Sequence, residues 1–183
     1  MLDWSLEVLE SVCDRVVVAV PPGYERDPDR VRGGASRSAS VRAALEAAPE
    51  ATVAVVHDAA RPLVTRELVE RCLEALEEGV DGAVAATPVS DTVKEADAAG
   101  RVLRTLDRSA LWAIQTPQVF RADALRRALD VDEATLAAAT DDAALVEAAG
   151  GSVVVVEAPA GNVKVTSRVD LELAEAMLRE RTC

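Results

Sequence analysis

The residues best placed for chemistry follow a short apolar run near the middle of the chain. Asp58 and Arg61 come directly after residues 53–56, a run of valine and alanine that predicts a buried parallel strand. In open α/β sheets, ligands bind beyond the carboxyl ends of such strands. A carboxylate is a hard ligand for Mg²⁺, and a guanidinium pairs with phosphate oxygens. The string therefore predicts a site for a metal and a phosphate, with a turn aspartate beside a solvated arginine as the simpler alternative.

Residue types that are rare in this chain give a second indication. The sequence has 18 Arg but only two Lys, one His, one Asn and two Gln. These counts indicate a compositional bias against such residues, as GC-rich codons produce. His57, Asn162 and Lys164 persist against the bias, each inside a short polar string, and are therefore candidates for positions where no substitute works. Chance survival is the alternative.

Hydrophobic spacing and turn residues predict the elements that must position these side chains. The alternation of strands with helices is typical of an α/β fold. Thr65 and Thr140 are the expected N-caps of their helices, and Ser167 caps the last one. Helices are predicted at 2–11, 41–48, 65–78, 121–129, 140–149 and after 167, and strands at 14–20, 53–56, 82–87 and 152–157, while 110–120 returns to the core.

Residues 88–110 differ from the rest because their apolar residues flank a polar tip at 97–100. This pattern predicts a β-hairpin with a long turn. The hairpin has too little apolar surface to be stable alone, so we expect it to pack on a partner subunit as a dimerisation arm.

Composition limits the classes of protein that this chain can represent. Its 183 residues suffice for one domain, 1–183. The net charge of −12 argues against a nucleic-acid partner. Three cysteines without a CxxC motif fit a reducing cytoplasm. No apolar run approaches membrane-spanning length, so we expect a cytoplasmic protein with no membrane partner.

Six strings together resemble one family. They are GGxxRxxS at 33–40, HDAARP at 57–62, DTVK at 91–94, DRSALWAIQTPQ at 107–118, TDDA at 140–143 and GNVKVT at 161–166. In this order and over nearly the whole chain, they are similar to the 2-C-methyl-D-erythritol 4-phosphate cytidylyltransferases. HDAARP alone also resembles ribitol-5-phosphate cytidylyltransferases, whereas the combination is far more specific.

The resemblance implies a Rossmann-like nucleotidyltransferase sheet with flanking helices, a protruding β-hairpin arm and a homodimer. It also implies in-line attack of 2-C-methyl-D-erythritol 4-phosphate on the α-phosphorus of CTP, with release of pyrophosphate. Asp58 and Lys164 are the implied catalytic residues: Asp58 would hold Mg²⁺, and Lys164 would stabilise charge at the α-phosphate. Gly34 and Ser40 would contact the cytosine and Ala59 the ribose; Arg61, Thr116, Thr140 and Thr166 would line the substrate pocket; Thr92 and Arg108 would reach the neighbouring subunit.

Each of these residues also has a structural alternative. Thr140 suits an N-cap with or without a substrate contact. Arg108 is long enough to lie over the hairpin. Asn162 is also a residue type that stabilises turns. Asp91 and Lys94 also have the charges of an exposed ion pair on the arm.

The sequence departs from the family pattern at its beginning. Family members open with a strand and a glycine-rich loop resembling PAAGxGxRxGxxxPK, and nothing similar precedes the helix predicted at 2–11. We therefore expect chain 1–183 to bind CTP weakly and to be inactive or nearly so. Ala35 is a smaller departure, since some relatives carry an acid there. An enzyme for ribitol 5-phosphate or another polyol phosphate, and a non-catalytic dimerising remnant, are the competing hypotheses.

Overall fold

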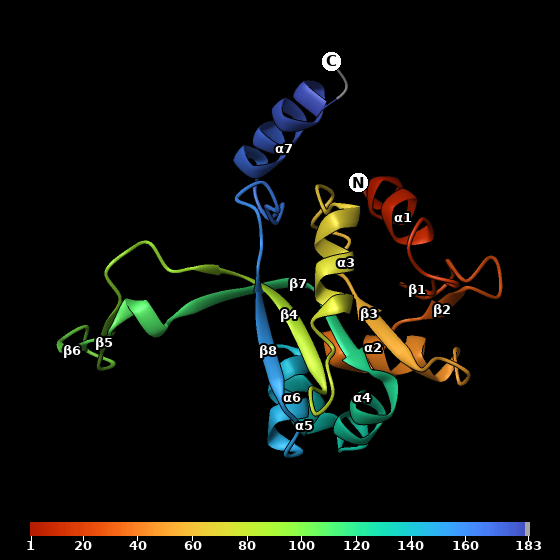
Figure 1. Cartoon of the computed structure of the whole chain (residues 1–183), viewed down its shortest axis with the longest axis horizontal. Coiled ribbons are helices and arrows are strands. Elements are labelled where there is room, and N and C mark those ends of the chain that lie inside the picture. Colours follow the sequence, from red (N-terminus) through yellow and green to blue (C-terminus); the bar gives the residue numbers. More distant parts are fainter. Residues whose placement is uncertain (182–183) are drawn as a thin grey trace.

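The computed structural model describes residues 1–181, whose centre is a four-stranded sheet. The strand order is β3 (Val53–Val56), β7 (Trp112–Arg121), β4 (Gly82–Pro88) and β8 (Val153–Glu157). Strand β7 runs antiparallel to both β3 and β4, whereas β8 runs parallel to β4. Strands β3, β4 and β8 therefore share one direction, and β7 is inserted between them against it (Figure 1).

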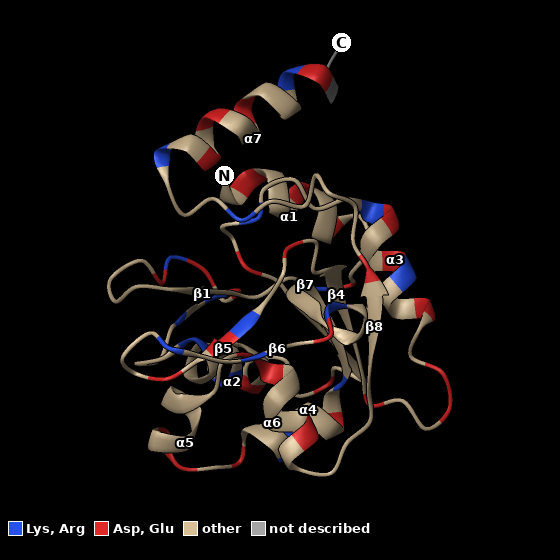
Figure 2. Ribbon diagram, turned by 90° about the vertical axis from the view of Figure 1, so that its left-hand side faces the viewer, with Lys and Arg blue, Asp and Glu red and all other residues tan. Residues whose placement is uncertain are grey.

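Helices cover both faces of this sheet, which confirms the predicted α/β fold. Alternating residues of β4 and β7 point to opposite faces. Val84 and Phe120 pack against α2 (Arg37–Glu46), α4 (Ala122–Leu129), α5 (Glu133–Ala138) and α6 (Asp142–Ala148). Ala83 and Val119 pack against α3 (Arg66–Glu74), with α1 (Leu2–Glu10) beside it. Figure 2 shows α1 above the sheet and α2, α4, α5 and α6 below it.

Two strand predictions were wrong about where the strand lies and which strand it pairs with. Strand β3 is neither parallel to its partner nor fully buried: it lies at the sheet edge, pairs only with antiparallel β7, and leaves Val53 39% exposed. Within 14–20, only β1 (Val18–Val20) is a strand, and it pairs in parallel with β2 (Arg30–Arg32) in a separate sheet. β-Branched runs indicate an extended backbone, but the pairing partner depends on the whole topology.

The helix predictions were closer to the structure. Thr65 caps α3 by accepting a hydrogen bond from the Leu68 N–H, as expected, although the helix ends at Glu74 rather than at 78. Thr140 is not the cap of α6, because the Asp141 side chain accepts from the Ala144 N–H in that role. No helix was expected in the region of α5, which Asp132 caps.

Residues 88–110 form the expected hairpin. Strands β5 (Lys94–Ala96) and β6 (Val102–Thr105) pair antiparallel in a sheet of their own, and the 3₁₀ helix η1 (Arg108–Ala110) leads back into β7. The arm projects from the ends of β4 and β7, and α7 (Arg168–Arg181) projects from another side of the body (Figure 1). Within residues 1–181, no helix has the length and apolar character needed to cross a membrane.

Candidate functional site

The loop after β3 is fixed by hydrogen bonds to itself and to the neighbouring strand. The Arg61 N–H donates to the Asp58 carbonyl at 2.9 Å. The Asp58 N–H donates to Thr116 Oγ1 at 3.1 Å. Thr116 lies on β7, two residues before Gln118, the partner of Val56, so the pairing of β3 with β7 brings its hydroxyl under the loop. Thr116 is buried, and the substrate contact expected from the sequence stays a prediction beside this structural role.

The single histidine belongs to the same network. The Thr116 hydroxyl lies 3.2 Å from His57 Nδ1, and His57 Nε2 lies 3.0 Å from the Arg61 carbonyl oxygen. A carbonyl only accepts, so Nε2 carries the proton and Nδ1 accepts from the threonine. Burial lowers the pKa of His57, which keeps the ring neutral at pH 7. His57 therefore connects Thr116 on β7 to the Arg61 carbonyl at the end of the loop.

The Asp58 carboxylate is held by two cations. Lys164 Nζ donates to Oδ2 at 2.7 Å, and Arg37 Nε donates to Oδ1 at 3.2 Å. Burial opposes ionisation of Asp58, but the hydrogen bond from Lys164 and the charge of Arg37 outweigh it and lower the pKa of the carboxyl group. The structure thus brings together Asp58 and Lys164, the two residues predicted to be catalytic, although 106 positions separate them.

Arg37 extends the network to a buried acid. Its Nη1 donates to Asp142 Oδ2 at 2.6 Å, and the Asp142 side chain has no exposed surface. Burial raises the pKa of Asp142, and the charge of Arg37 acts against this. Arg37 and Asp142 are the first residues of α2 and α6, so two helix beginnings converge on Asp58.

The glycine-rich turn before α2 is closely packed. The Gly34 N–H donates to Ser40 Oγ at 3.1 Å, and the Ser40 hydroxyl donates to the Ser36 carbonyl at 2.9 Å. A Cβ atom added at Gly34 would lie 2.4 Å from the Ala39 Cβ, which excludes any side chain there. Gly34 and Ser40, expected to contact the cytosine, therefore lie side by side.

The segment that carries Lys164 is anchored by Asn162 and Arg61. The buried Arg61 side chain donates through Nη1 to the Asn162 carbonyl at 2.7 Å. Asn162 Nδ2 donates to Gln115 Oε1 at 2.8 Å and to the Thr116 carbonyl at 2.9 Å. These bonds tie the segment to β7 and to the loop after β3, and so hold Lys164 beside Asp58. Burial also lowers the pKa of Arg61.

Four predicted residues make none of the hydrogen bonds described for this cluster. The Thr166 hydroxyl donates to Asp170 Oδ2 at 2.8 Å, at the beginning of α7. Thr140 lies just before the cap of α6. Thr92 and Arg108 lie on the projecting arm, where Arg108 donates to the Ser90 carbonyl.

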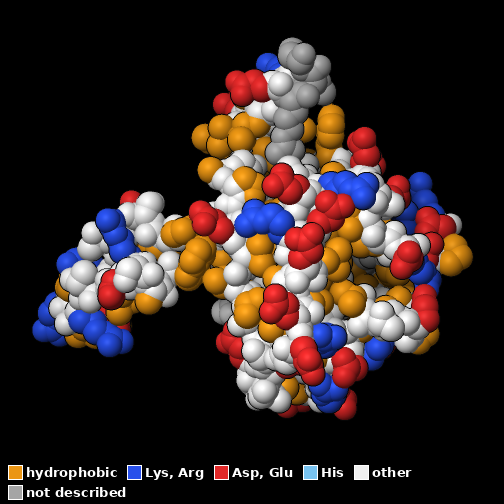
Figure 3. Space-filling view, viewed as in Figure 1, with side chains coloured by type: hydrophobic (Ala, Val, Ile, Leu, Met, Phe, Trp, Pro, Cys, Tyr) orange, Lys and Arg blue, Asp and Glu red, His pale blue; other side chains and the backbone are white. Residues whose placement is uncertain are grey.

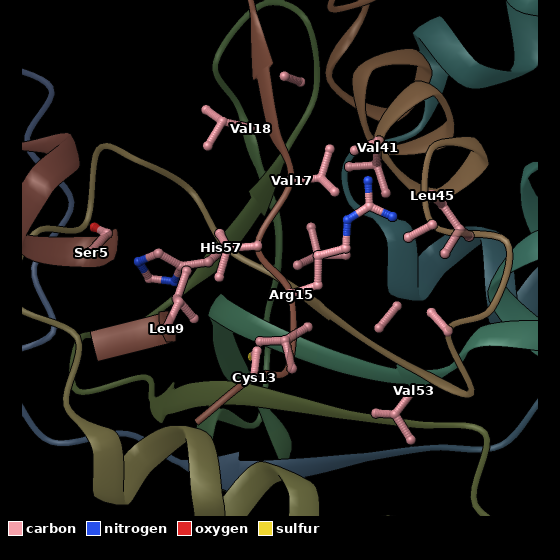
Figure 4. Close-up of a pocket in the computed structure, with 18 of the residues that line it drawn as sticks. Ser5, Leu9, Cys13, Arg15, Val17, Val18, Val41, Leu45, Val53 and His57 are labelled. Atoms are coloured by element: carbon pink, nitrogen blue, oxygen red, sulfur yellow. The ribbon is translucent and has the colours of Figure 1, made fainter. Parts of the chain in front are cut away.

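A cavity of about 730 Å³ opens beside the cluster. Apolar side chains form most of its wall, chiefly valines, leucines and alanines of α1, α2, β3 and residues 12–19, with His57 at one side (Figure 4). Three of the residues predicted to bind nucleotide, Ser40, Asp58 and Ala59, line it together with Arg37. Within residues 1–181, no group of three or more histidine, cysteine or acidic side chains could bind a metal unaided.

The sequence reasoning gave no role in the site to Arg37 or Asp142, and it singled out His57 only as a rare residue type. All three lie inside the strings that were singled out, so the signal was present. Only the fold shows that Arg37 faces both Asp58 and Asp142.

Solved structures share this architecture. A 2-C-methyl-D-erythritol 4-phosphate cytidylyltransferase from Thermus thermophilus superposes with a TM-score of 0.82 at 39% identity, covering 97% of this chain and 88% of that one. A 4-diphosphocytidyl-2C-methyl-D-erythritol synthase from Anaerococcus prevotii gives a TM-score of 0.85 at 27% identity, covering 97% and 88%. By fold and site, the chain is a nucleotidyltransferase-type α/β protein.

Sequence comparison narrows this class to one family. The model of the 2-C-methyl-D-erythritol 4-phosphate cytidylyltransferase family matches residues 1–180. The protein of this name from Rubrobacter xylanophilus is 51% identical over 152 residues, which cover 82% of this chain and 65% of the relative. That from Nocardia farcinica is 46% identical over 180 residues, covering 93% and 76%. The chain belongs to the 2-C-methyl-D-erythritol 4-phosphate cytidylyltransferase family, and its match spans 65% and 76% of the length of these two relatives.

Proposed function

We propose that the protein transfers CMP from CTP to 2-C-methyl-D-erythritol 4-phosphate, in non-mevalonate isoprenoid biosynthesis. The products are 4-diphosphocytidyl-2-C-methyl-D-erythritol and pyrophosphate. A phosphate oxygen of the substrate forms a bond to the α-phosphorus of CTP, and the bond from that phosphorus to the α,β-bridging oxygen breaks. Family membership supports the choice of reaction. The observation that most supports this reaction is the Asp58–Lys164 ion pair beside the cavity.

The chemistry needs positioning and charge stabilisation rather than a covalent nucleophile. Lys164 is a compact cation on a flexible stem and is 44% exposed, so it is free to reach a phosphate. The cavity lies within the range of roughly 300–1,000 Å³ that is usual for small-molecule sites. Gly34 and Ser40 would contact the cytosine, and Ala59 the ribose. The methylerythritol phosphate would be bound by Arg61, Thr116, Thr140 and Thr166.

Asp58 is the residue that would hold Mg²⁺. Its lowered pKa keeps the carboxylate ionised at neutral pH. One carboxylate suffices because Mg²⁺ commonly combines one or two carboxylates with substrate phosphates and water. When bound, the ion would neutralise part of the triphosphate charge.

The assembly that we propose is a homodimer through the arm. Val102 and Leu103 on the arm are 60% and 61% exposed, and Trp112 and Ile114 at its base are 36% and 42% exposed. Hydrophobic side chains also gather at the base of the arm in Figure 3. A partner subunit would cover them and receive Thr92 and Arg108.

The compartment that we propose is the cytoplasm. Cys13 and Cys72 are free thiols. Unpaired thiols are usual in a reducing compartment.

The test is pyrophosphate release from CTP with Mg²⁺ and either methylerythritol phosphate or ribitol 5-phosphate. The protein is assayed with each substrate separately. We expect CTP to be consumed only with methylerythritol phosphate. A preference for ribitol 5-phosphate, or no turnover with either substrate, would overturn the proposal.

A further inference from the structure

We propose that Arg37, anchored on Asp142, is a positioning residue that fixes the Asp58 carboxylate through Oδ1. Lys164, on Oδ2, is then the partner that is able to leave Asp58 for a phosphate of the nucleotide. The inference rests on the proposed function, because it concerns how Asp58 and Lys164 serve CTP and Mg²⁺.

The two ion pairs of Asp58 differ in how readily they can be released. Lys164 is 44% exposed and has no other partner among the bonds described above, so its ammonium can leave Oδ2 for solvent or for a phosphate. Arg37 is 33% exposed and bonds at its other end to Asp142, whose side chain is fully buried. Removing Arg37 would leave that buried carboxyl without its counter-charge, which is far more costly. The Arg37 pair is therefore the fixed one.

The shape of the guanidinium explains why an arginine occupies this position. Its Nε contacts Asp58 and its Nη1 contacts Asp142, at 3.2 and 2.6 Å. The planar fork reaches both acids at once, whereas a lysine ammonium is a single point charge on a flexible stem. Arg37 thereby sets the Asp58 side chain relative to the beginnings of α2 and α6.

The network also balances its charges. Two acids, Asp58 and Asp142, face two cations, Arg37 and Lys164. When Lys164 turns to a phosphate, Oδ2 loses its cation while Oδ1 keeps Arg37. A divalent cation held by Asp58 would restore the balance of charge, and Lys164 would then be free to pair with a phosphate.

A purely structural role, in which Arg37 only ties α2 to α6, is the alternative to exclude. Such a role predicts lower thermal stability with an unchanged dependence on Mg²⁺. A positioning role predicts a changed Mg²⁺ dependence in a folded protein.

The experiment measures turnover against Mg²⁺ concentration for Arg37→Lys and Arg37→Gln. Arg42→Gln is the matched control, because Arg42 lies on the same helix but pairs with the exposed Glu133. We expect the half-saturating Mg²⁺ concentration to rise, or kcat to fall, roughly 10–100-fold in both Arg37 variants. The control should match the parent. Parental Mg²⁺ dependence and kcat in a folded Arg37 variant would overturn the inference.

Asp142→Asn is a second probe, introduced into the parent and into Arg37→Lys. If Asp142 acts through Arg37, its replacement alters the Mg²⁺ dependence in the parent but not further in Arg37→Lys. An equal effect in both backgrounds would overturn the inference.

A crystal structure of Arg37→Gln separates this inference from the proposed function. If the parent shows no turnover, the proposed function fails, yet the orientation of Asp58 in the variant still decides the positioning role. A reoriented Asp58 carboxylate supports the role, and an unchanged one refutes it.

Discussion

Replacing Asp58 by asparagine is expected to abolish most activity while leaving the fold intact. The change keeps the size of the side chain and removes its charge. It therefore removes the carboxylate that Lys164 contacts and one of the two that Arg37 contacts. Losing one such preorganised electrostatic group typically lowers kcat by ~10²–10³.

The cost in stability follows from the exposure of the two pairs. Asp58 is 18% exposed, but its partners Lys164 and Arg37 are 44% and 33% exposed, so solvent screens both pairs. Arg37 also keeps Asp142, so no buried charge is left alone. We expect a loss of about 1 kcal/mol in the free energy of unfolding. For a chain of this length, that corresponds to a fall in Tm of about 2–4 °C.

The assay pairs pyrophosphate release with thermal denaturation followed by circular dichroism. Asp123→Asn is the control, because it removes an exposed ion pair with Arg127 on α4, away from the site. A rate for Asp58→Asn within a few-fold of the parent would refute the role of Asp58. A much larger fall in Tm would show that the lost rate reports unfolding, and would refute the stability argument.

Three further outcomes are expected. Lys164→Ala lowers kcat by ~10² or more with little change in Tm; parental kcat would contradict this. Replacing residues 89–111 by a short glycine linker yields a monomer in sedimentation and loses activity, whereas an unchanged dimer would contradict the arm's role. Cys72 is buried and its pKa is raised to about 11, so mass spectrometry should find it unalkylated at pH 8 until guanidinium unfolds the chain.

Local sequence signals predicted local structure well. Thr65 caps α3, and the hairpin of the arm turns at Gly100, whose φ of 78° suits glycine. The apolar runs at β4 and β8 became strands of the central sheet. The cap of α6 was displaced by one residue because Thr, Asp and Asp in succession are all good caps.

Local sequence signals could not predict which distant segments pair with each other. Residues 14–20 and 53–56 are rich in valine, yet one became part of a separate two-stranded sheet and the other a sheet edge. Their neighbours depend on crossover connections that no single stretch encodes.

The same limit applied to the site. Asp58 was identified because it follows an apolar strand, and Lys164 because lysine is rare in this chain; the family resemblance supplied the role of Lys164. Arg37 reaches Asp58 across 21 positions and Asp142 across 105, so its role is visible only once the fold brings them together.

The position of β7 bears on how the chain can be assembled during synthesis. Strands β3 and β4 leave the ribosome early, but each hydrogen-bonds to β7 rather than to the other. Neither can acquire its central partner until residues 112–121 have been made, after the whole arm. The nascent chain must therefore carry two exposed strand edges through the synthesis of the arm, the situation in which chaperone binding protects a protein from aggregation.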